Sequence, residues 1–68
     1  MQTQLIKYLI QKTLEMKSNL LAISTPDAII FIANVPTYSY NKKTTTMLTL
    51  LDTHLDYLRK NLEVAQND

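Results

Sequence analysis

His54 is the only histidine in this chain of 68 residues, and the sequence contains no cysteine. A histidine can act as a general base near neutral pH, but it needs a nucleophile to activate. Asp52 and Asp56 lie two residues to either side of it, and side chains at that spacing on a helix point away from one another. The sequence places no serine beside His54 either. We therefore expect no catalytic site, and the chain is predicted not to be an enzyme.

Three carboxylates, Asp52, Asp56 and Glu63, share one face of a predicted helix. Grouped carboxylates are typical of metal sites and of acid–base catalysis. The same face carries Arg59 and Lys60, however, so its charges alternate in sign as they do on a solvated helix surface. A single histidine without cysteines also excludes the usual zinc sites. We expect neither a metal nor a cofactor.

The sequence contains no glycine. Phosphate-binding loops, dinucleotide-binding turns and nucleophile elbows all need a backbone that only glycine supplies. The longest apolar run, residues 28–33, is far shorter than the roughly 20 residues that cross a bilayer. The N-terminus shows no basic segment followed by an apolar one, as a signal peptide would. We therefore expect a cytoplasmic protein without a membrane span.

The segment from Tyr38 to Lys43 combines two aromatic side chains, Tyr38 and Tyr40, with two basic ones, Lys42 and Lys43. Tyrosine often anchors protein interfaces, and aromatic rings next to lysines can also stack on nucleic-acid bases. The net charge of +1 is low for a nucleic-acid-binding domain. We predict a loop that contacts a protein partner, with an ordinary polar loop that covers the end of a helical bundle as the alternative.

Two long segments have the periodicity of amphipathic helices. From Gln2 to Ile23, apolar side chains cover about half of the helix circumference, which favours contact with two neighbours, and only Thr13 and Lys17 interrupt this arc. From residue 46 onward, leucines recur at alternating spacings of three and four, as in a coiled coil. His54 and Asn61 lie in one row beside this stripe, either as a polar seam in a helix interface or with their polar ends in water. The predicted oligomer interface comprises Leu48, Leu51, His54, Leu55, Leu58, Asn61 and Leu62.

The middle of the chain is ambiguous, because residues 28–33 are apolar on all sides and fit either a helix or a buried strand. Its flanking residues favour a helix: Pro26 suits the first position, Asn34 suits a left-handed residue after the last turn, and Pro36 prevents continuation. We predict a short helix here, followed by a loop over residues 35–43.

The predicted fold is all-α, a single helical domain over residues 1–68. Helices over 2–23 and 46–66 pack antiparallel, with a short buried helix over 26–34. The opposite net charges of the two ends of the chain favour this packing. A chain this short has a marginal core, so we expect oligomerisation to complete the bundle. The alternative is an α+β fold in which a short strand at 28–35 pairs with its copy across a dimer.

The predicted function is a small non-enzymatic interaction module, such as a regulator, inhibitor or adaptor. It would be homo-oligomeric and act through an apolar helix face, the segment from Tyr38 to Lys43, or both. The alternative is a small dimeric DNA-binding regulator. In that case phosphates would be contacted by Lys7, Lys12, Lys42 and Lys43.

Overall fold

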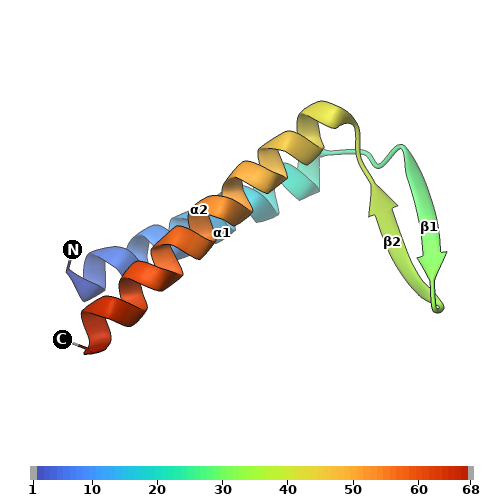
Figure 1. Ribbon diagram of the computed structural model, residues 1–68. Coiled ribbons are helices and arrows are strands. Elements are labelled where there is room, and N and C mark those ends of the chain that lie inside the picture. The colour runs from blue at the N-terminus through green and yellow to red at the C-terminus, as the bar shows by residue number, and fades with distance from the viewer. Residues whose placement is uncertain (1, 68) are drawn as a thin grey trace.

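The chain forms a pair of long antiparallel helices joined by a β-hairpin, as Figure 1 shows for a computed structural model. The structure describes residues 2–67. Helix α1 spans Thr3–Ile23, strand β1 spans Ala28–Ile32, strand β2 spans Val35–Ser39, and helix α2 spans Lys42–Asn67. The two ends of the chain lie together at one end of the helix pair, and the hairpin projects from the other end (Figure 1).

The core lies between the two helices. Ile6, Leu55 and Leu58 are the buried apolar side chains there, with 0%, 3% and 1% of their surface exposed. On α2 the leucines that follow the predicted coiled-coil spacing face α1. The facing stripe of α1 has the same spacing and comprises Ile6, Ile10, Thr13, Lys17 and Leu20, all buried or half-buried. The two long amphipathic helices are therefore confirmed.

Thr13 and Lys17, which interrupt the apolar arc in the sequence, lie at the centre of this helix pairing. Thr13 is 1% exposed, and its hydroxyl donates to the Leu9 carbonyl oxygen at 2.7 Å, so its polar atom is satisfied within the helix. Lys17 is half-buried and reaches Asp52 on α2. The face of α1 that packs on α2 is therefore partly polar. As a result, several apolar side chains of α1 lie outside this face and remain exposed.

The short central helix predicted over residues 26–34 is wrong, and so is the all-α fold. This segment contains β1 and the two-residue turn that leads into β2, so the fold is α+β. β-Branched residues at positions 29, 30 and 32 favour an extended backbone. The strand considered as an alternative is present, but its partner is β2 of the same chain, with Ile32 opposite Val35 and Ala28 opposite Ser39.

The turn of the hairpin explains why the sequence favoured a helix. Ala33 and Asn34 both have positive φ angles, of 51° and 66°. Two successive left-handed residues make a type I′ turn, whose twist matches that of the flanking strands. The left-handed conformation predicted for Asn34 is therefore confirmed, but it serves a hairpin turn instead of ending a helix.

The predicted loop over residues 35–43 is also wrong, because β2 and the first turn of α2 occupy most of it. Helix α2 begins at Lys42, four residues before the start predicted at residue 46. Asn41 is the N-cap residue: its side-chain oxygen accepts a hydrogen bond from the Thr44 amide at 2.8 Å. Its carbonyl oxygen also accepts from the Thr45 amide at 2.9 Å.

Candidate functional site

The β-hairpin exposes apolar side chains on both of its faces. Strand alternation places Ile29 and Phe31 on one face and Ile30 and Ile32 on the other. Each of these four side chains is more than half exposed, and Phe31 reaches 68%. Within residues 2–67, neither helix packs against either strand. An isolated two-stranded hairpin is only marginally stable in water. Contact with another surface would therefore stabilise this hairpin by burying its apolar side chains.

The two edges of the hairpin differ in their capacity to pair with another strand. The residues that flank a two-residue turn form a hydrogen-bonded pair, so the next pair, Phe31 with Pro36, is not hydrogen-bonded and its backbone groups point outward. Proline has no N–H group, so the outer edge of β2 lacks a donor at Pro36. The outer edge of β1 keeps its donors and acceptors at Ile29 and Phe31. β1 is therefore the edge suited to strand addition.

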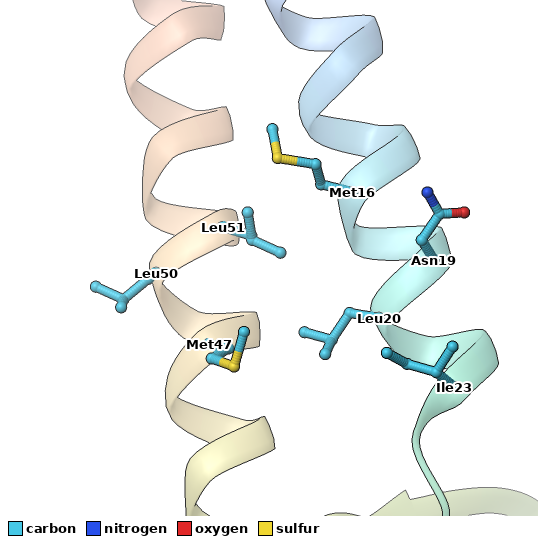
Figure 2. Close-up of a pocket in the computed structure, with 7 residues that line it drawn as sticks. All are labelled: Met16, Asn19, Leu20, Ile23, Met47, Leu50 and Leu51. Carbon is cyan, nitrogen blue, oxygen red and sulfur yellow. The ribbon is translucent and has the colours of Figure 1, made fainter.

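A second apolar surface lies on the helix pair, next to the hairpin. Figure 2 shows an open groove between α1 and α2, with a volume of about 490 Å³. Asn19 contributes the one polar side chain to its lining. The other residues that line it are Met16, Leu20, Ile23, Met47, Leu50 and Leu51. Leu50 points away from α1 in this view (Figure 2) and is 65% exposed.

The residues predicted as an oligomer interface divide into two groups. Leu55 and Leu58 are buried within the single chain, and Leu48, Leu51 and Leu62 are half-buried in the same stripe against α1. The polar members lie beside that stripe. His54 is exposed and stacks on Tyr57, with ring centroids 6.4 Å apart, and the Asn61 amide donates to the Tyr57 carbonyl oxygen at 2.8 Å.

The residues of the predicted partner-binding loop lie in three different elements. Tyr38 belongs to β2 and is 52% exposed, whereas Tyr40 is half-buried just after the strand. Lys42 and Lys43 are exposed in the first turn of α2. All four remain at the hairpin end of the molecule, where Tyr38 lies on the same face of the hairpin as Ile29 and Phe31.

The lysines of the DNA-binding alternative do not gather into one patch. Lys7 lies 16 residues before the end of α1, about 24 Å along the helix axis from the hairpin end, where Lys42 and Lys43 lie. Lys12 pairs with Glu15 at 3.3 Å and lies 5.5 Å from the centre of the Tyr8 ring. The continuous basic stripe typical of DNA-binding domains is therefore absent among these four side chains.

The hairpin residues Ile29 and Phe31 and the groove residues Met16 and Ile23 were not among the predicted site residues. The run of β-branched residues in β1 was the available signal for the hairpin. The groove carried no separate signal, because its α1 residues belong to the same wide apolar arc as the buried ones.

No helix in the described part of the chain is both long enough and apolar enough to span a membrane. Comparisons with protein-family models, curated proteins and solved structures find no match to this chain. The fold and the exposed surfaces define a small α+β protein with a helical hairpin and a projecting β-hairpin.

Proposed function

We propose that this protein is a non-enzymatic interaction module that binds another protein through its β-hairpin. The observation that carries this proposal is the hairpin itself: its two strands expose apolar side chains on both faces, and no helix within the described residues 2–67 packs against either one. A partner that covers Ile29, Phe31 and Tyr38 removes their apolar surface from water. Each Å² of apolar surface buried in this way contributes about 25 cal/mol of favourable free energy. A partner that covers this face stabilises a hairpin that is marginal alone.

The expected mode of binding is addition of an extended strand to the outer edge of β1. Main-chain hydrogen bonds to Ile29 and Phe31 supply affinity in such complexes, and flanking side chains supply specificity. The hairpin carries no charged side chain from Ala28 to Ser39, so the fitting segment is apolar and uncharged. Tyr38, on the neighbouring strand, adds an aromatic contact of the kind enriched at binding hot spots. A regulator, an inhibitor or an adaptor acts by contacts of this kind.

A pair of substitutions at Ile29 tests this proposal. Ile29→Pro removes an outward-facing N–H from the edge of β1 without removing a hydrogen bond of the hairpin, because Ile29 and Tyr38 are a non-hydrogen-bonded pair. Ile29→Val keeps that N–H group and most of the side chain, so it is the matched control. Proteins retained from a cell extract by the immobilised chain are identified, and the binding of each is then measured with purified components.

We expect a specific partner to bind the wild-type chain and the Ile29→Val variant with similar affinity. The Ile29→Pro variant is expected to bind it at least tenfold more weakly. Equal affinity of the wild-type chain and the Ile29→Pro variant for every purified partner would contradict the proposal.

A further inference from the structure

Helix α2 carries a second stripe with coiled-coil spacing, next to the stripe that packs on α1. Its positions alternate in steps of three and four residues, as the leucine stripe does. Four members are apolar or aromatic and 43–65% exposed, namely Met47, Leu50, Tyr57 and Val64, and the other two are His54 and Asn61. These six residues form the outer stripe.

The outer stripe continues across the groove onto α1. Met16 and Ile23, which line the groove from α1, are 51% and 83% exposed. The far flank of α2 differs, because Asp52, Asp56 and Arg59 lie there and are exposed. One broad face of the helix pair is therefore apolar, and the face on the other side of α2 is charged.

The surface area of the whole chain, hairpin included, is larger than that of a compact protein of the same mass. A compact protein of 7.8 kDa exposes about 4,400 Å². This chain exposes 5374 Å², about 1,000 Å² more than that. Its radius of gyration is 15.0 Å, compared with about 11 Å for a compact domain of the same length. A stable protein interface buries about 800 Å² on each partner, and the excess, which the helix pair shares with the hairpin, is of that size.

We propose that a second copy of this chain packs against the outer stripe, with the two α2 helices antiparallel about a twofold axis. A twofold interface needs a surface that is complementary to itself. With the axis between positions 54 and 57, His54 faces Tyr57 of the second copy, Leu50 faces Asn61, and Met47 faces Val64. The His54–Tyr57 stack then meets its own copy at the centre.

The polar members of the outer stripe suit this interface. The Asn61 amide already donates to the Tyr57 carbonyl at 2.8 Å, so part of its hydrogen-bonding capacity is satisfied when the second copy covers it. None of the six residues is an acid, a lysine or an arginine, so two copies meet without like charges at short range. The four helices then form a bundle, with both hairpins outside it.

The mass in solution tests this inference, which does not rest on the proposed function of the hairpin. Light scattering on the purified chain at about 100 µM is expected to give twice the monomer mass of 7.8 kDa. Leu50→Glu places a charge in the outer stripe at an exposed helical position, so it is expected to give the monomer mass with the helical circular dichroism retained. Thr49→Glu, at an exposed position about 100° around the helix from Leu50 and outside the outer stripe, is the matched control and is expected to remain dimeric.

A crosslinking experiment tests the antiparallel arrangement. The chain contains no native cysteine, so only the introduced cysteines react with a thiol crosslinker. We expect a thiol crosslinker of about 10 Å, the distance between packed helices, to link the Leu50→Cys variant to the Asn61→Cys variant when the two are mixed. Each variant alone is expected to give little product. Efficient crosslinking of Leu50→Cys to itself would overturn the arrangement. A monomeric wild-type chain, or a Thr49→Glu variant that dissociates as Leu50→Glu does, would overturn the interface.

The outcomes for the two surfaces are separable. If Leu50→Glu dissociates the dimer but Ile29→Pro leaves partner binding unchanged, the proposed function is overturned and this inference stands. If Ile29→Pro alone abolishes partner binding and the wild-type chain is monomeric, this inference is overturned and the proposed function stands.

Discussion

Lys17 Nζ lies 2.7 Å from Asp52 Oδ1 and joins the two helices through a salt bridge. It is the only salt bridge between α1 and α2 within residues 2–67, since the other described pair, Lys12 with Glu15, lies within α1. The side chains of Lys17 and Asp52 are 33% and 52% exposed, so water and salt screen their attraction. The pair sets the position of one helix on the other at a modest gain in stability.

A double-mutant cycle with Lys17→Ala and Asp52→Ala measures that gain. We expect a coupling energy of about 0.2–1 kcal/mol in low salt, falling toward zero in 1 M NaCl. Urea denaturation of the four proteins at both salt concentrations gives the value. A coupling that salt leaves unchanged would show that packing of the Lys17 stem, and not charge, joins the helices here.

Leu58→Ala removes a side chain that is 1% exposed at the helix interface. Cavity formation and lost burial are expected to lower the free energy of unfolding by about 2–5 kcal/mol. For a chain of this size that is a large share of the total stability. Leu14→Ala, at a position 43% exposed, is the matched control and is expected to cost about 1 kcal/mol or less. Thermal denaturation followed by circular dichroism compares them, and equal losses would contradict the assigned core.

Ala33 is the weak point of the hairpin, because its φ of 51° is unfavourable for a residue with a Cβ atom. Asparagine tolerates this conformation and is preferred at the first position of a type I′ turn. Ala33→Asn is therefore expected to stabilise the hairpin by about 1 kcal/mol, and Ala33→Val to destabilise it. Hydrogen exchange at the Ile30 and Thr37 amides reports both changes. Faster exchange in Ala33→Asn would rule out the assigned turn.

Asn41 connects the hairpin to α2 as an N-cap, through the 2.8 Å hydrogen bond from the Thr44 amide. Asn41→Ala is expected to cost about 1 kcal/mol. Asn41→Asp keeps an accepting oxygen and adds a negative charge at the positive end of the helix dipole, next to Lys42 and Lys43. We expect this variant to be at least as stable as the wild-type chain in urea. A loss in Asn41→Asp similar to that in Asn41→Ala would argue against capping.

The two long helices could be predicted from the sequence because their apolar residues repeat with the helical period over many turns. The hairpin could not, since its turn uses Ala33 and Asn34 in place of the glycine-containing pairs that mark such turns. Pro26, Asn34 and Pro36 are each compatible with a short helix and also with a β-hairpin. The pairing of β1 with β2 selects the hairpin, and this pairing depends on contacts between residues that a local sequence pattern does not reveal.

The candidate surfaces were predictable only in part. On α2 the leucine stripe and the outer stripe are neighbours with the same spacing, and either could face α1. The denser leucine stripe does so, which leaves Leu50 and Tyr57 exposed. On α1 the apolar arc is wider than the packed face, which includes polar Thr13 and leaves apolar Met16 outside. A choice between adjacent faces depends on the shape of the partner helix.

The position of the hairpin between the helices also sets an order of folding. Ile32 and Val35 pair across a separation of three residues, whereas Lys17 and Asp52 are 35 residues apart. The entropic cost of closing a loop rises with its length, so contacts near the turn form at the lowest cost, and each helical turn farther from it joins later. Mutations near Leu20 and Leu51 are therefore expected to slow folding, whereas those near Ile6 mainly speed unfolding.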